Sequence, residues 1–363
     1  MRKELGEDNY EEIYLMDNYY TSFNNNCIQF YETYNKQNDF QCCLKIINKE
    51  KMKLGDYDFL LEQIKKEEEI SQLCKSDYIL NLNKKFETQN YIIFEYEYYE
   101  GSLLKYIYEN GEYEEEKNKE YFKEIIISIG KALKILYEKG IIHRNIRTDN
   151  FFVKSLDDEK KKIIIKLGNF DCSIYKKDNK YEPIGNIHYA APEIIKNLEY
   201  DEKCDLWSLG ITLYELYFCD LPFDPSLFYA HSNLTNNDII EKIYDEKNFI
   251  FRKSKIPTID ILFKRLLSIN PKERMTYDEF FEYIFNDNFM KKDVIFVNNN
   301  KKYKEIYNII LKEPVLERQF ITDIDNSSFG DPRISIINSV PSIPENKILF
   351  KKGQPLGWHK YFL

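Results

Sequence analysis

The chain has 363 residues, a formal net charge of −9 and 43% hydrophobic residues. That content is enough for one two-lobed domain or two small ones, and the negative charge argues against a dominant role in nucleic-acid binding. The 7 cysteines include no Cys-x-x-Cys pair, which favours reduced thiols inside a cell. There is no apolar signal region at the start and no apolar run of about 18 residues, so we expect a cytoplasmic protein.

The first part of the chain carries strand patterns. Residues 12–50 predict paired strands, because the run 27–34 alternates with a period of two and 35–39 has the composition of a turn. We expect a helix over 57–75 and a buried strand over 91–96. This part of the chain is therefore predicted to be rich in β-structure.

The following part is mainly helical. Apolar residues recur at helical spacing between Phe122 and Leu136 and predict a helix over 118–139. Two short strands are expected over 151–156 and 163–167, and the pattern from about 200 to 288 is helical with loops. A β-rich part followed by an α-rich part indicates an α+β fold.

Residues 290–363 differ from the rest of the chain. Proline and glycine interrupt any long element there, yet apolar side chains persist, unlike in a typical solvated tail. We expect an extended tail that docks on a partner protein or folds back on the chain's own large lobe. Its apolar anchors are Ile306, Ile309, Ile310, Phe320, Ile334, Ile336, Ile337, Phe350, Leu356, Trp358 and Phe362.

The segment 142–150, Ile-His-Arg-Asn-Ile-Arg-Thr-Asp-Asn, is the most informative stretch. It resembles the catalytic loop of eukaryotic protein kinases, H-R-D-L-K-x-x-N, in which the Asp accepts the proton of the substrate hydroxyl. Asn145 stands at that position, and a neutral amide accepts a hydrogen bond but cannot act as a proton base. Arg147 replaces the loop Lys, and Asn150 matches the final Asn.

Two further positions depart from the family pattern. Asn169 begins Asn169-Phe170-Asp171, which resembles the metal motif D-F-G without its first carboxylate. Mg²⁺ favours carboxylate and phosphate oxygens, so the resemblance implies a weakened metal site. Asn186 stands where serine/threonine kinases usually carry a Thr beside the base.

The architectural motifs of the family are retained. Ala191-Pro192-Glu193 matches A-P-E, and the segment 205–210 matches D-x-W-S-x-G, whose Asp, here Asp205, usually clamps the backbone of the catalytic loop. The segment 270–274 resembles the late motif whose Arg pairs with the A-P-E Glu. The resemblance therefore implies a buried ion pair between Glu193 and Arg274. The structural residues that it implies are His143, Arg144, Glu193, Asp205, Trp207 and Arg274.

This resemblance implies a two-lobed protein-kinase-like fold with a C-terminal extension. The expected boundaries are 1–11 for an N-terminal lead, 12–96 for a small β-rich lobe, 97–289 for a large α-helical lobe and 290–363 for the tail. The resemblance itself covers roughly residues 10–288.

The strand lysine of the family, from V-A-I-K, matches Lys45 in Cys42-Cys43-Leu44-Lys45. It pairs with a helix Glu in active members. Glu67 is the partner if the loop after the helix has the common length, and this register leaves Ser71 at a position that is usually apolar. Glu69 is the alternative and would place Leu73 there instead, and a third possibility is that these Glu residues form a solvated helix face.

The nucleotide positions are altered. The span 20–30, where the family has its glycine-rich loop, contains no glycine, so side chains would crowd the phosphates. Phe30 and Phe152 stand where the family usually has Val and Leu above and below adenine, and Phe94 resembles the residue at the back of the pocket. The nucleotide-site residues that the resemblance implies are Lys45, Glu67, Phe30, Cys43, Phe94, Phe152, Arg147 and Asn150.

The sequence thus predicts a catalytically inactive kinase-like protein, a pseudokinase, that is a scaffold or binding subunit and not an enzyme. No cofactor is expected, with ATP and Mg²⁺ binding weak or absent and no metal ligands. Protein partners are expected to bind through the tail and the kinase-like surface, with no nucleic acid and no membrane involved. Two alternatives stay open: a residually active serine/threonine kinase with atypical catalytic residues, and a structural subunit of a ciliary or microtubule assembly, associated with the cytoskeleton.

Overall fold

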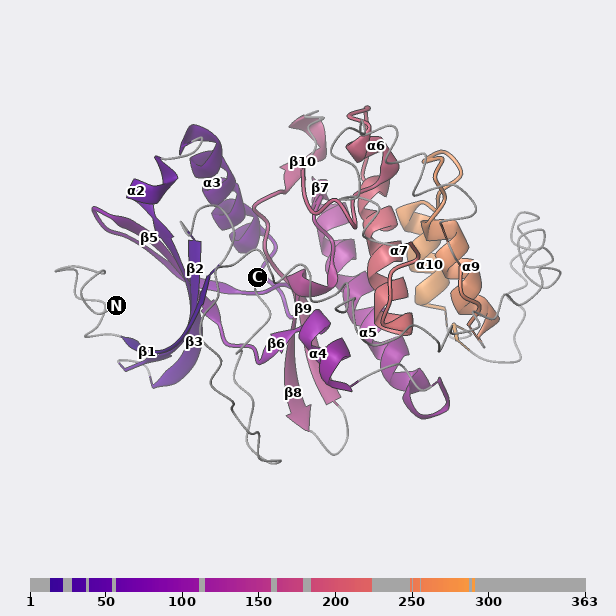
Figure 1. Cartoon of the computed structure of the whole chain (residues 1–363), viewed down its shortest axis with the longest axis horizontal. Coiled ribbons are helices and arrows are strands. Elements are labelled where there is room, and N and C mark those ends of the chain that lie inside the picture. Colours follow the sequence, from indigo (N-terminus) through magenta and orange to yellow (C-terminus); the bar gives the residue numbers. More distant parts are fainter. Residues whose placement is uncertain are drawn as a thin grey trace, which may run out of the picture. The chain divides into compact units, whose positions relative to one another are not determined.

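The computed structural model describes residues 14–21, 28–36, 39–53, 57–110, 115–157, 162–178, 184–223, 249, 251–254, 256–286 and 289–290. The chain forms two compact units (Figure 1). The first unit comprises Met1–Leu60, Leu82–Glu100 and Arg318–Leu363, and the second comprises Leu61–Asn81 and Gly101–Glu317. The segment Leu61–Asn81, which the sequence placed in the β-rich lobe, thus belongs to the helical unit.

The first unit is built on an antiparallel sheet with the strand order β1-β2-β3-β5-β4. Its strands alternate side chains between two faces, as the period-two pattern predicted. The short helix α2 (Lys49–Met52) follows β3, and the Asn48 side chain caps it by accepting a hydrogen bond from Lys51 N at 3.0 Å. The strands are β1 (Tyr14–Thr21), β2 (Ile28–Asn35), β3 (Phe40–Asn48), β4 (Leu82–Glu87) and β5 (Tyr91–Glu97).

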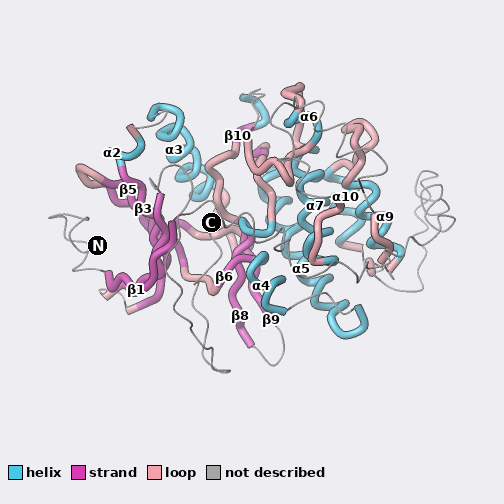
Figure 2. The backbone as a smooth tube through the Cα atoms, in the orientation of Figure 1, coloured by secondary structure: helices cyan, strands magenta, loops and turns pink. Residues whose placement is uncertain are grey.

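Helix α3 (Tyr57–Leu73) begins in the first unit and continues in the second. The second unit is mainly helical, as the cyan segments of Figure 2 show. Its other helices are α4 (Leu103–Asn110), α5 (Glu115–Glu138), α6 (Pro192–Ile195), α7 (Lys203–Phe218), α9 (Pro257–Leu266) and α10 (Tyr277–Ile284), with the 3-10 turns η1 (Thr148–Asn150) and η2 (Lys176–Asp178).

Two small sheets lie in the second unit and carry the catalytic-loop segment. Strands β6 (Gly101–Ser102), β8 (Phe151–Asp157) and β9 (Lys162–Leu167) form one sheet. Strand β7 (Ile141–Ile142) pairs antiparallel with β10 (Ile174–Tyr175). Because β7 ends directly before His143 and β8 begins directly after Asn150, both ends of the segment 143–150 are fixed by strand pairing.

The second unit has a hydrophobic core formed mainly by its helices. The predicted stripe of α5 is buried from Phe122 to Leu136, and α7 is buried on nearly all sides. Helix α10 begins with a capping box, in which the side chains and backbones of Thr276 and Glu279 bond reciprocally. Met290 is buried in the same core, so the core extends one residue past the predicted lobe boundary at 289.

The α+β fold with a β-rich part followed by a helical part is confirmed. The sequence missed β4 because its side chains are mostly exposed and do not alternate, and it missed α4 altogether. The glycine-free loop at 22–27 and the tail from 291 onward lie outside the described residues. No helix in the described ranges combines the length and apolar character needed to span a membrane.

Candidate functional site

The backbone of the catalytic-loop segment is held by one buried carboxylate. Asp205, near the start of α7, accepts hydrogen bonds from His143 N and from Arg144 N, both at 2.7 Å. Burial raises the pKa of Asp205 to about 7, and the two backbone N–H groups act in the opposite direction. The clamp that the sequence predicted is present.

This carboxyl group gives a testable dependence of stability on pH. Because its folded pKa is raised above the ordinary value of 3.8 to about 7, the native state binds the Asp205 proton more tightly than the unfolded state. The stabilisation is fully present below about pH 4 and is lost as pH rises through about 7. We expect Asp205→Asn, which cannot titrate, to flatten this decline in urea unfolding between pH 5 and 7.5.

Asp201→Asn is the matched control, because Asp201 is an exposed carboxylate four residues away. It should keep the pH dependence of the unmutated chain. An unchanged slope in Asp205→Asn would show that another group causes the decline.

Three of the predicted site residues are linked by hydrogen bonds from the side-chain amides of Asn150 and Asn169, and Asn145 takes part through its backbone carbonyl. Asn150 Nδ2 donates to the Asn145 carbonyl at 2.6 Å, and Asn169 Nδ2 donates to Asn150 Oδ1 at 3.2 Å. Asn145 Oδ1 is buried, and it has no hydrogen-bond partner among the described residues. The arrangement therefore presents an acceptor at the position where the family has its base.

The segment before A-P-E approaches the catalytic loop very closely. A Cβ atom on Gly185 would lie 2.3 Å from the Arg144 carbonyl oxygen, and Gly185 has φ +89°. No other residue fits there without displacing backbone. Asn186 uses its side-chain oxygen locally, accepting from His188 N at 3.0 Å.

Arg147 and its neighbours form a charged cluster that the sequence did not single out as a unit. Arg147 Nη2 donates to the carboxylate of the buried Asp149, and the guanidinium carbon lies 5.8 Å from the centre of the Tyr189 ring. One oxygen of Asp149, Oδ1, is buried without a hydrogen-bond partner in the described part of the chain. Burial, followed by the charge of Arg147, lowers the pKa of His188 to about 4, so this imidazole is neutral at neutral pH.

A second carboxylate, the partly buried Glu215 on α7, completes this region. Thr148 Oγ1 and Tyr189 OH both donate to Glu215 Oε2, at 2.8 and 2.6 Å. Burial raises the pKa of Glu215, and these two donors oppose that shift. The sequence missed Glu215 because it lies 67 positions from Thr148 and only the fold brings the two residues together.

His143 and Arg144 have structural roles. His143 Nε2 lies 3.2 Å from the Gly168 carbonyl, and burial lowers the pKa of the imidazole to about 4. Arg144 donates from Nε to the Cys172 carbonyl at 2.7 Å and from Nη1 to Tyr200 OH at 2.9 Å. These contacts tie the catalytic loop to the backbone on both sides of Asn169 and to Tyr200, which follows α6.

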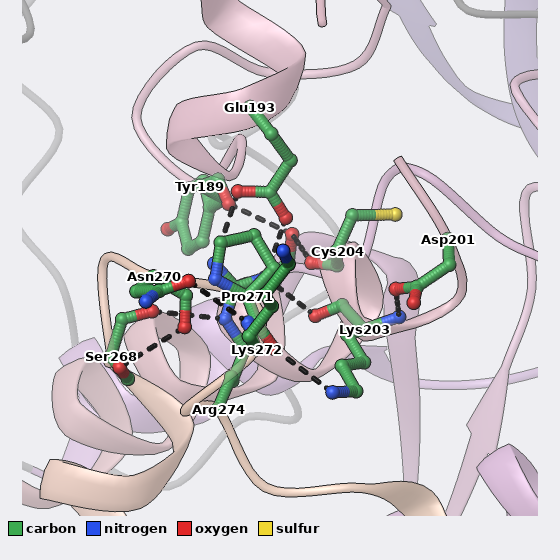
Figure 3. A network of polar contacts seen from close by, with 11 residues as sticks. Tyr189, Glu193, Asp201, Lys203, Cys204, Ser268, Asn270, Pro271, Lys272 and Arg274 are labelled. Carbon is green, nitrogen blue, oxygen red and sulfur yellow. Dashed lines mark hydrogen bonds and ion pairs between the residues drawn. The ribbon is translucent and has the colours of Figure 1, made fainter. Parts of the chain in front are cut away.

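The predicted ion pair between Glu193 and Arg274 is confirmed (Figure 3). Arg274 binds the carboxylate with two hydrogen bonds, from Nη1 to Oε1 at 2.6 Å and from Nη2 to Oε2 at 3.0 Å. Its other donors reach the carbonyls of Ser268 and Lys203, and the guanidinium carbon lies 5.2 Å from the Trp207 ring centre. The pair links α6 to the loop before α10.

In the first unit, the strand register places the predicted nucleotide residues on one face of the sheet. Phe30, Lys45 and Phe94 are directly opposite one another on β2, β3 and β5. Lys45 Nζ lies 5.8 Å from the centre of the Phe30 ring, and Phe94 is fully buried. Cys43 faces the same way, and burial raises its pKa to about 12, so its thiol stays protonated.

In the second unit, the side chain of Phe152 packs on Gly168, the residue before Asn169. A Cβ atom on Gly168 would lie 2.9 Å from Phe152 Cε2 and 3.0 Å from Leu80. A bulky ring therefore lies directly beside the backbone that leads into the metal motif.

The two candidate Glu residues of α3 differ in their surroundings. Glu67 and Ser71 are each only 2% exposed, whereas Leu73 is 46% exposed. Glu69 Oε1 instead accepts a hydrogen bond from Tyr175 OH at 2.6 Å. Glu67 is thus on the buried side of α3, and the solvated-face interpretation is wrong for this residue.

Comparison with known proteins identifies the family. The model of the protein kinase domain matches residues 26–289. A probable serine/threonine-protein kinase from Dictyostelium discoideum is 25% identical over 90% of this chain and 36% of its own length. An Aurora kinase from Patiria pectinifera is 28% identical over 67% of this chain and 55% of its own length. The serine/threonine-protein kinase ATG1a from Arabidopsis thaliana is 31% identical over 60% of this chain and 34% of its own length. The chain spans between 34% and 55% of the length of these three relatives.

These relatives correct one prediction. The expectation that the chain is not an enzyme is wrong, because the kinase-domain match and relatives named as serine/threonine-protein kinases point to an enzyme. The physical reason why activity can persist lies in the transition state of phosphoryl transfer. Phosphoryl transfer passes through a loose transition state in which positioning and electrostatics dominate, so the loss of carboxylates at Asn145 and Asn169 does not by itself exclude activity.

The family match covers most of the chain, and the motifs follow one another in family order from Lys45 to Arg274. The catalytic-loop clamp and the Glu193–Arg274 ion pair show that its architecture is intact. The chain belongs to the protein kinase family.

Proposed function

We propose that the chain is a serine/threonine protein kinase of low turnover, in which amides replace the catalytic carboxylates. The observation that carries the proposal is the built catalytic loop: Asp205 holds its backbone, Asn150 bonds across it, and Asn145 Oδ1 remains as a buried acceptor without a partner in the described residues. A loop held in this way can position a substrate hydroxyl group, and positioning is a large part of phosphoryl transfer.

Asn145 would orient the nucleophile without accepting its proton. Its amide oxygen can accept the hydrogen bond of a serine or threonine hydroxyl group and aim the oxygen at the phosphorus atom. The proton would pass to the transferred phosphoryl group or to water. Since general base catalysis contributes roughly 10²- to 10⁴-fold, its loss predicts a slow enzyme.

The side chains do not fit a carboxylate-anchored Mg²⁺ site. At the family's metal positions the chain offers two neutral amides, Asn150 and Asn169, and Asn150 Oδ1 accepts the hydrogen bond from Asn169. Mg²⁺ prefers carboxylate and phosphate oxygens. Across the described ranges, no group of three or more His, Cys, Asp or Glu side chains could hold a metal ion. The proposed transfer therefore has no step that depends on Mg²⁺ held by carboxylates at these two positions.

Nucleotide binding is expected to be weak. Ligand at 100 times its dissociation constant stabilises a protein by about 2.7 kcal/mol, and we expect millimolar ATP to give a much smaller melting shift. The reason is the bulk of Phe30 and of Phe152, which packs on Gly168. The double variant Phe30→Val with Phe152→Leu should show a larger shift, measured by differential scanning fluorimetry. A full-sized shift in the unmutated chain would contradict the expectation.

The test of the proposed function is transfer of radiolabelled γ-phosphate to generic protein substrates, followed by phosphoamino-acid analysis. The proposal predicts slow labelling of serine and threonine. Labelling confined to tyrosine would contradict the substrate class, and the absence of labelling after long incubation would contradict the activity.

A further inference from the structure

The sheet of the first unit has a second face, opposite to the face that carries Lys45. Because successive side chains of a strand point to opposite faces, the register places Tyr31, Leu44 and Glu95 side by side on it. We call it the outer apolar face. Its buried apolar residues are Tyr31, Cys42, Leu44, Ile46, Tyr91 and Ile93, with Phe40 and Phe86 partly buried beside them.

The outer apolar face is covered, although no described helix contributes to it. Cys42, Leu44 and Ile93 are at most 1% exposed, whereas every described member of their cluster lies on a strand of the same sheet. One layer of side chains cannot seal itself from water, because a sheet face is buried only by packing against a second layer. The face therefore needs a second layer, which the described helices do not supply.

The composition of the sequence favours the C-terminal tail as the segment that supplies this second layer. Residues 1–13, MRKELGEDNYEEI, are mostly polar and charged, and 22–27 is only a short link between β1 and β2. The tail is rich in apolar residues, including Phe320, Phe350 and Trp358. The preceding segment 291–317 can span roughly 90 Å when extended, so the tail can reach this face.

The polar residues of the face suit the tail as well. Thr33, Asn35 and Glu95 are buried there, and Asn35 Nδ2 donates to Glu95 Oε2 at 3.2 Å. A carboxylate in an apolar surface favours a cationic neighbour. The tail offers basic residues close to its apolar ones, at Arg333, Lys351 and Lys352.

We propose that Arg318–Leu363 docks on the outer apolar face of its own sheet, with apolar anchors such as Phe350 and Trp358 facing Leu44 and Ile46. The tail is then the second layer of the first unit. This docking is independent of phosphoryl transfer, since the outer apolar face is opposite to Lys45.

Alkylation of Cys42 tests the docking in the full chain. Cys42 lies on the outer apolar face, while Cys74 and Cys204 are buried in the second unit and report on global unfolding. We expect the double variant Phe350→Ser with Trp358→Ser to raise the rate of Cys42 alkylation by a maleimide about tenfold or more, as a local opening would. The rates at Cys74 and Cys204 should not change.

The matched control is Ile306→Ser with Ile310→Ser, the same kind of change in the tail but outside 318–363. It should leave the rate at Cys42 unchanged. An unchanged rate in the Phe350 and Trp358 variant would overturn the proposal.

If the variant unfolds, the thiols of Cys42, Cys74 and Cys204 will all react faster, and alkylation will not test the docking. A second measurement tests it in that case. The photo-reactive residue benzoylphenylalanine is placed at position 350 of the otherwise unmutated chain and cross-linked. Cross-links to β2, β3 or β5 of the same molecule support the docking. Cross-links only to the second unit, to another copy of the chain or to an added partner protein would overturn it.

Discussion

Replacing Arg274 with Met is expected to lower the free energy of unfolding by about 3–5 kcal/mol. The guanidinium is completely buried and makes two hydrogen bonds to the Glu193 carboxylate, so the change leaves a buried negative charge without its partner. Two backbone carbonyls, of Ser268 and Lys203, lose their donor at the same time. Urea unfolding at neutral pH measures the effect.

The control for this variant is a solvent-exposed ion pair. Lys134 and Glu138 are 3.9 Å apart on the surface of α5, with half or more of each side chain exposed. Lys134→Met should leave stability unchanged within error, because exposed pairs contribute little. Equal effects of Arg274→Met and Lys134→Met would show that the buried pair does not stabilise the fold.

Restoring the carboxylate at position 145 is expected to increase phosphoryl transfer by about 10²-fold or more. Asn145→Asp replaces the side-chain amide with a carboxylate. It leaves in place the backbone carbonyl of residue 145, which accepts the hydrogen bond from Asn150. The new carboxylate can take the proton of the substrate hydroxyl group, which the amide cannot. The initial rate with a generic substrate at saturating ATP measures the gain.

Asn197→Asp provides the same chemical change outside the site, since Asn197 lies in the turn after α6. It should leave the rate unaltered. If Asn145→Asp is no faster than Asn197→Asp, residue 145 is not positioned at the reacting hydroxyl group, and the proposed role of the amide fails.

The sequence was sufficient to predict the architecture, because each retained motif implies the residue with which it pairs. A-P-E and the late Arg motif imply each other, so the ion pair of Glu193 could be predicted over 81 positions. The clamp by Asp205 followed in the same way. Strands with clear alternation were found, whereas β4 was missed because its exposed side chains lack the pattern of a half-buried strand.

Other parts of the site depended on the fold. The choice between Glu67 and Glu69 needed the burial of each side of α3, which the mixed polar sequence of that helix leaves open. The network of Glu215 with Thr148 and Tyr189 was not visible in any single motif. The prediction of inactivity failed for a different reason: it counted missing carboxylates, whereas the hydrogen bonds that hold the catalytic loop are retained.

The rate of phosphoryl transfer by the unmutated chain, compared with that of Lys45→Met, tests the central claim most directly. Lys45 is buried on the face of the sheet that carries Phe30 and Phe94, and in the family it contacts the nucleotide phosphates. The account predicts slow labelling of serine and threonine that exceeds background and disappears in Lys45→Met. Labelling that is absent from the unmutated chain, or that persists unchanged in Lys45→Met, would contradict it.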